Sequence, residues 1–171
     1  MSKAKSEIET HTFTVLVNNE PGVLARVIGL FAGRGYNIES LTVAEVSDEK
    51  NLSRITIVTS GTIQIIDQIR AQLERLVPVH SVGDLTEDGP HVERELALVK
   101  VRSEGEARVE SLRIADIFRA RVVDSTKESF VFEIVGDTGK LDAFIGLMEP
   151  LGLVDVSRTG VAAISRGPNP M

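Results

Sequence analysis

The 171-residue sequence contains no cysteine and no tryptophan, and only 4% of its residues are aromatic. The absence of cysteine excludes disulfides, thiolate nucleophiles and cysteine-ligated zinc. No apolar run approaches the roughly 20 residues that a membrane span needs. The first residues, MSKAKSEIETH, are polar and lack the apolar stretch of a signal peptide. These absences predict a soluble, cytoplasmic protein with aliphatic cores.

Positive charge is also scarce. The chain carries 25 acidic against 19 basic residues, for a net charge of -6. Nucleic acids and anionic membranes bind basic surfaces, so neither is an expected partner. The length suits one ordinary domain or two small ones.

The first half of the chain alternates short β-type runs with helical periodicity. The predicted elements are a strand at Thr12–Val17, a helix at Pro21–Gly33, strands at Ile38–Val46 and Leu52–Thr59, a helix capped by Thr62 and stopped by Pro78, and a strand at Val79–Leu85. The first helix has its predicted apolar stripe at i, i+3, i+4 and i+7, which are Leu24, Val27, Ile28 and Phe31. Gly33 and Gly35 offer a left-handed end to that helix.

The same pattern recurs after a polar linker at Glu87–His91. The predicted elements are a strand at Glu95–Arg102, a helix at Gly105–Ala120 with Ile114, Ile117 and Phe118 on one face, strands at Arg121–Asp124 and Phe130–Val135, a helix capped by Asp137, and a strand at Val154–Thr159 that Val161–Ile164 can extend. Both halves read βαββαβ, which predicts an α+β fold of two tandem ferredoxin-like domains, at residues 10–86 and 92–166. A single larger α/β sheet is the alternative, and the linker and the repeated order disfavour it.

Catalytic and metal-binding motifs are missing. His11, His80 and His91 do not have ligand spacing, and we expect all three to be exposed strand or linker residues. The segment GDTGK at Gly136–Lys140 does not fit a phosphate-binding loop, and the third strand lacks the aromatic residues of an RNA-binding domain. A binding or regulatory role is therefore favoured over an enzymatic one, with no catalytic residues and no metal site predicted.

The run NNEPG leads into the first predicted helix, with Pro21 in its first turn. Gly22 has no side chain, so a ligand can approach the helix N-terminus, whose free N–H groups and dipole favour a carboxylate. Asn19 supplies an amide beside that helix end, and Asn37 lies just beyond its other end. A carboxylate site next to amide oxygens suits an α-amino acid. By residue chemistry alone, a plain turn is the simpler interpretation.

The run PGVLARVIGLFAGRGYNIESLTV, after the strand FTVLV, resembles the ACT domain of the small, regulatory subunit of acetohydroxyacid synthase, also called acetolactate synthase. Later segments, LVKV, IFRARVVD, GKLDAFIGLMEPLG and ISRGP, resemble the C-terminal domain of that subunit. The resemblance extends from about Thr12 to Pro168. It therefore covers nearly the whole chain.

This resemblance implies a large catalytic partner subunit that carries thiamine diphosphate, Mg²⁺ and FAD and condenses two 2-oxo acids in valine, leucine and isoleucine biosynthesis. The small subunit would have no cofactor of its own. It would activate the large subunit and confer feedback inhibition, usually by valine. ACT domains of the family pair as homodimers and bind the effector at their interface.

Carried over to this sequence, the resemblance implies an effector site of Asn19 and Gly22 from one chain and Asn37 from its partner. Pro21 would shape the turn, and Ile38 and Val43 are weaker candidates for an apolar lining. Two rival functions stay open at this point: a free-standing ACT-type amino-acid sensor, and a small enzyme of ferredoxin-like fold such as an acylphosphatase. The second rival is disfavoured because NNEPG lacks an arginine.

Overall fold

The computed structural model describes residues 7–170. The chain forms two compact units: unit 1 comprises the residues up to Val92 together with the segment from Ala162 onward, and unit 2 comprises Glu93–Val161. The prediction of no signal peptide rests on residues 1–11, of which 1–6 lie outside the described part. No helix within the described residues is both long enough and apolar enough to cross a membrane.

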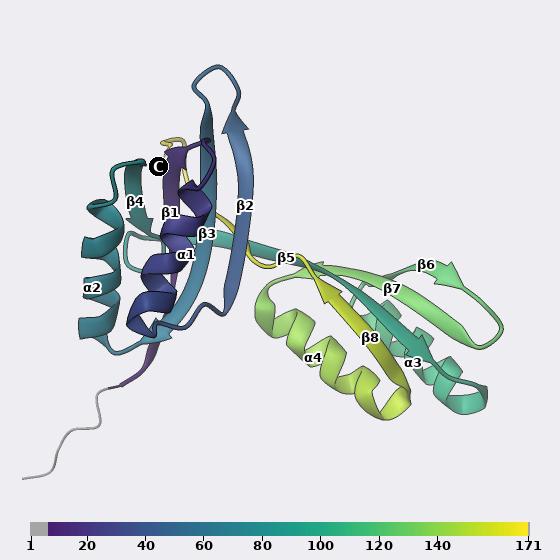
Figure 1. The fold of residues 1–171 in the computed structure, drawn as a ribbon. Coiled ribbons are helices and arrows are strands. Elements are labelled where there is room, and N and C mark those ends of the chain that lie inside the picture. Colours follow the sequence, from purple (N-terminus) through teal and green to yellow (C-terminus); the bar gives the residue numbers. More distant parts are fainter. Residues whose placement is uncertain (1–6, 171) are drawn as a thin grey trace, which may run out of the picture. The chain divides into compact units, whose positions relative to one another are not determined.

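Unit 1 contains a four-stranded sheet in the order β2-β3-β1-β4, with antiparallel neighbours. Its elements in chain order are β1 (Glu9–Asn18), α1 (Val23–Arg34), β2 (Ser40–Ser47), β3 (Leu52–Gly61), α2 (Ile63–Glu74) and β4 (Val79–Asp84). Figure 1 shows both helices against the same face of this sheet. Strands β2 and β4 are therefore the edges, and among the described residues of unit 1 no helix lies on the opposite face of the sheet.

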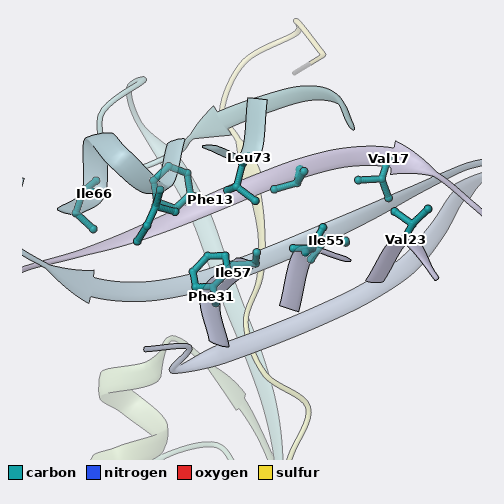
Figure 2. Close-up of a cluster of buried hydrophobic side chains, with 11 residues drawn as sticks. Phe13, Val17, Val23, Phe31, Ile55, Ile57, Ile66 and Leu73 are labelled. Carbon is teal, nitrogen blue, oxygen red and sulfur yellow. The ribbon is translucent and has the colours of Figure 1, made fainter. Parts of the chain in front are cut away.

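The core of unit 1 lies between its sheet and its two helices (Figure 2). Alternate residues of β1, which are Phe13, Val15 and Val17, point into it. The buried stripe of α1 is Val23, Val27 and Phe31. The predicted stripe is confirmed for Val27 and Phe31 but wrong for Leu24 and Ile28, which are each 37% exposed. The residues that face the sheet are the i, i+4, i+8 series that starts at Val23. Leu24 and Ile28 each follow one residue after a member of this series, so they lie at the margin of the buried face.

The two ends of α1 are set by glycines in the left-handed region. Gly22 precedes the helix with φ 84°, and Gly35 follows it with φ 69°. Because left-handed backbone cannot start a right-handed helix, Pro21 lies in the preceding turn and not, as predicted, in the first helical turn. Gly35 ends the helix as predicted, whereas Gly33 lies inside it.

Unit 2 repeats this topology with the sheet order β6-β7-β5-β8. Its elements are β5 (His91–Arg102), α3 (Gly105–Ile117), β6 (Arg121–Ser125), β7 (Ser129–Gly136), α4 (Thr138–Met148), a short 3₁₀ turn at Glu149–Leu151 and β8 (Leu153–Arg158). The prediction of two ferredoxin-like βαββαβ folds is confirmed, and each sheet has its own core.

Two details of the second half differ from the prediction. Ile117 ends α3 with 63% of its surface exposed, because the buried face of this helix is Ser111, Ile114 and Ala115. The residues after β8 form a separate strand, β9 (Ala162–Ser165), which pairs with β5 instead of extending β8. Within unit 1, the Arg166 N–H donates to the carbonyl of Pro90 at 3.0 Å.

The prediction of an exposed His11 is wrong, because this residue is buried with 2% of its surface accessible. Strand β1 starts at Glu9, three residues earlier than predicted, so His11 is paired with Thr59 of β3 and stacks near Phe13 at 6.5 Å. Its position is in phase with the core-facing residues of the strand. His80 is exposed and His91 is half-buried.

Candidate functional site

The turn between β1 and α1 is held by backbone hydrogen bonds. The Asn19 N–H donates to the carbonyl of Asn51 at 2.8 Å, and the Glu20 N–H donates to the carbonyl of Asn18 at 3.0 Å. These bonds fix the turn while the side chain of Asn19 stays exposed. The amide of Asn19 is thus presented beside the start of α1 by a backbone that is already ordered.

Helix α1 starts without a side-chain cap. By contrast, Thr62 accepts a hydrogen bond from the Ile65 N–H in α2, and Asp137 accepts one from the Lys140 N–H in α4, as predicted. Helix α3 also lacks a side-chain cap, but its first turn contains Glu106. Among the α-helices of residues 7–170, only α1 has neither a cap nor an acidic residue in its first turn. Its N-terminal dipole is therefore not neutralised by its own side chains.

Gly22 is needed at this helix start for its conformation and also leaves space in front of it. With φ 84° the position favours glycine, and a Cβ built there would meet no atom within 4 Å. Within unit 1, the described residues thus leave open space directly in front of Gly22. A carboxylate could reach the first N–H groups of α1 here, as expected for an anion at a helix N-terminus.

Asn37 lies at the opposite end of the same helix. Its carbonyl accepts a hydrogen bond from the Thr59 hydroxyl at 2.5 Å, and its side chain is exposed. A helix of 12 residues is about 18 Å long, so Asn37 is far from Asn19 and Gly22 within one chain. The fold of a single chain therefore brings Asn19, Pro21 and Gly22 together and leaves Asn37 apart.

The two weaker candidates have different surroundings. Ile38 is half-buried and packs on the core of unit 1. Val43 is 44% exposed on the edge strand β2. It pairs with the core residue Ile55, so its side chain lies on the helix-covered face of the sheet. The same edge strand also exposes Val46, at 49%. Sequence periodicity could not reveal this exposed apolar edge because it does not show which strand ends the sheet.

One side-chain cluster of the described residues has the donor set of a metal site. Single ligating atoms of His11, Asp84 and Glu87 lie within 4.8 Å of one another. However, His11 Nδ1 lies 2.6 Å from Asp84 Oδ2, and His11 Nε2 lies 3.0 Å from Glu9 Oε2. Two ligands of a tetrahedral zinc ion would be roughly 3.3 Å apart, given bonds of about 2.0 Å. The geometry is that of a hydrogen-bonded structural pair.

Two family matches cover most of the chain. Residues 13–81 match the AHAS small subunit-like ACT domain, and residues 94–167 match the small subunit of acetolactate synthase. The probable acetolactate synthase small subunit of Archaeoglobus fulgidus is 47% identical over 92% of this chain and 97% of its own length. This chain belongs to the acetolactate synthase small-subunit family. Together the two family matches span both units of the fold.

Other small subunits agree with this assignment. The acetolactate synthase isozyme 3 small subunit of Escherichia coli is 47% identical over 90% of this chain and 94% of its own. The crystal structure of the Thermotoga maritima small subunit has a TM-score of 0.82 and 38% identity, and the match covers 94% of this chain and 99% of that one. The tandem fold is thus the fold of a solved small subunit.

Proposed function

We propose that this chain is the non-catalytic regulatory subunit of an acetolactate synthase. It would activate a large catalytic subunit and make it sensitive to feedback by valine or a related branched-chain amino acid. The family match over both units carries this proposal. The large subunit, with its thiamine diphosphate, Mg²⁺ and FAD, would supply all the chemistry of 2-oxo acid condensation, and the complex would work in the cytoplasm.

Residues 10–86 would form the effector-binding ACT domain. The valine carboxylate would lie at the uncapped N-terminus of α1, in the open space in front of Gly22. The exposed amide of Asn19 would accept a hydrogen bond from the ammonium group. Pro21 would shape the turn, and Ile38 and Val43 would line the aliphatic part of the ligand.

Asn37 would complete this site from a second copy of the chain. Within one chain it lies at the far end of α1, about 18 Å away. A symmetric dimer that pairs the β2 edges would bury Val43 and Val46, which a single copy leaves 44% and 49% exposed. Residues 92–166 would serve dimerisation or contact with the large subunit.

The effector site is tested by valine inhibition of the holoenzyme reconstituted with the large subunit. Asn19→Ala should raise the inhibitory valine concentration at least about tenfold and leave activation unchanged.

Asn and Asp both tolerate the left-handed region, so Gly22→Asp and Gly22→Asn form a matched pair that differs only in charge. The holoenzyme with Gly22→Asp should lose valine inhibition more completely than the holoenzyme with Gly22→Asn, because the added carboxylate repels the carboxylate of valine. Gly29→Asp, which adds the same charge at an open position inside α1, is the control. Wild-type inhibition of Gly22→Asp would refute the site.

The shared site is tested with mixed dimers. Combining an Asn19→Ala chain with an Asn37→Ala chain gives one doubly altered site and one intact site if the site spans two chains. Valine binding to the mixed dimer should then recover to about half of the wild-type stoichiometry. If each site used one chain only, both sites would be damaged and no recovery would appear.

Association with the large subunit separates this function from a free-standing amino-acid sensor. The purified chain should bind the acetolactate synthase large subunit and increase its turnover. A sensor acting on another enzyme would bind valine without binding this partner. The match of unit 2 to the small subunit of acetolactate synthase favours the first outcome.

A further inference from the structure

A second concave region lies on the face of the unit 1 sheet that carries no helix. It is a cavity of about 320 Å³. Its floor is formed by residues that are paired laterally across strands β3, β1 and β4 of the sheet. Arg54, Leu16 and Ser81 are direct neighbours on β3, β1 and β4. In the next row, Thr14 lies opposite Gly83. The volume is at the low end of the range for ligand pockets, so it suits a small molecule.

The cover of this cavity is the segment after β4, together with Ser165 of β9. The covering residues are Leu85, Asp88, Gly89 and Pro90. Asp88 and Glu87 donate their N–H groups to the carbonyl of Asp84 at 2.8 and 3.2 Å, which fixes the turn. Gly89 has φ 128°, a conformation that favours glycine. Residues 82–93 lie between the two segments that match the family.

The charges around the cavity are complementary to a zwitterion. Arg54 is half-buried, and within the described residues no carboxylate forms an ion pair with it. On the other side, Asp88 Oδ2 lies above Gly83, 3.7 Å from where a Cβ of that residue would be. The Cα atoms of Arg54 and Gly83 are two strands and two residues apart, or roughly 12 Å. Between the two charged groups, Leu16, Leu85 and Pro90 provide apolar surface, and Thr14, Ser81 and Ser165 provide hydroxyls.

Asp88 argues against a simple anion as the occupant. A carboxylate ligand without an amino group would pair with Arg54 but would meet the negative charge of Asp88 in the same small space. That charge is only weakly offset, because the Arg70 guanidinium approaches Asp88 no closer than 3.9 Å and is shared with Glu74 and Glu87. An ammonium group on the ligand removes this conflict.

We propose that this cavity is a second amino-acid site, distinct from the one at α1, that binds a zwitterionic amino acid with a short aliphatic side chain. The carboxylate pairs with Arg54 and the ammonium group with Asp88. The ligand's side chain packs on Leu16 and Leu85. The site is complete within one chain and does not depend on the proposed effector site, since α1 lies on the other face of the sheet.

The test is a titration of the ¹⁵N-labelled full chain with L-valine, read by amide chemical shifts. Gly83 and Gly89 report on this cavity, whereas Gly22 and Gly35 report on the two ends of α1. We expect saturable shifts at Gly83 and Gly89. Arg54→Met and Asp88→Asn should each weaken that binding at least tenfold. In Asp88→Asn the introduced amide oxygen can still accept the hydrogen bond from the Asp84 N–H, which is 3.0 Å long in the native chain. Arg75→Met, at the exposed end of α2, is the control for loss of a positive charge.

Two ligands test the class of compound. Isovalerate lacks the ammonium group and isobutylamine lacks the carboxylate, and each should bind at least tenfold more weakly than valine at Gly83 and Gly89. Equal binding of isovalerate would overturn the zwitterion assignment. Absence of shifts at Gly83 and Gly89 at millimolar valine, or their loss in Asn19→Ala but not in Arg54→Met, would overturn the site. If valine shifts the signals of Gly83 and Gly89 but not the signal of Gly22, that result would count against the effector site at α1 and not against this cavity.

Discussion

The imidazole of His11 and the carboxylate of Asp84 form a hydrogen-bonded pair that joins β1 to the end of β4. The distance from Nδ1 to Oδ2 is 2.6 Å, and the two side chains are 3% and 1% exposed. Asp84 Oδ1 also accepts from the Thr86 N–H at 3.1 Å. The pair therefore anchors the end of β4, where the segment that covers the cavity begins.

Replacing His11 should destabilise unit 1 strongly. His11→Leu leaves the buried carboxylate of Asp84 without its partner, which costs about 3–5 kcal/mol of unfolding free energy. The double variant His11→Leu/Asp84→Asn should recover part of this loss, because the amide can still accept from Thr86 without carrying a charge. Urea unfolding measures both, with His80→Gln at an exposed histidine as the control. A double variant no more stable than His11→Leu would show that the charge pair does not matter.

The same pair should make stability depend on pH. Burial by itself lowers the pKa of His11, but hydrogen bonds to Glu9 and Asp84 and the charges of Asp84 and Glu87 raise the pKa overall above the ordinary value of about 6.5. The stabilisation is thus fully present below about pH 6.5 and is lost as the pH rises through the folded-state pKa. The difference in unfolding free energy between wild type and His11→Leu, measured from pH 5.5 to about 8.5, should shrink as pH rises. A constant difference would contradict this assignment.

Gly152 should tolerate no side chain. It has φ 103°, and a Cβ there would lie 2.0 Å from the carbonyl oxygen of Arg102. Backbone strain and overlap together should cost Gly152→Ala at least about 2 kcal/mol. Gly146→Ala, inside α4 with no atom within 4 Å of its added Cβ, should be neutral or stabilising by up to about 1 kcal/mol. Thermal unfolding of the two variants measures the contrast, and equal melting temperatures would refute it.

The proposed dimer predicts a specific effect of charge on the β2 edge. Val43→Glu places a carboxylate where the second chain would pack and should raise the dimer dissociation constant at least about tenfold. Val77→Glu adds the same charge at a side chain that is 92% exposed, outside the proposed interface, and should leave dimerisation unchanged. Sedimentation velocity distinguishes the two. A Val43→Glu chain that dimerises like wild type would exclude this edge as the interface.

The sequence by itself determined the order of elements and the fold class. Alternating β1 residues, helical periods and turn residues are local signals, and so are the caps at Thr62 and Asp137, because each depends on a few neighbouring residues. The run NNEPG likewise indicated a helix start that a ligand can approach at Gly22. Its interpretation as an effector site required the family resemblance, and that residue assignment stays a proposal.

Only the tertiary structure decided which residues meet across the sheet. His11 and Asp84 are 73 positions apart in sequence, and Arg54 and Asp88 become two sides of one cavity only through strand register and the turn after β4. Periodicity also could not choose between two adjacent stripes of α1, because only the packing of the helix on the sheet decides which stripe is buried. Burial, charge pairing and cavity shape depend on residues distant in sequence, and no local pattern encodes those distances.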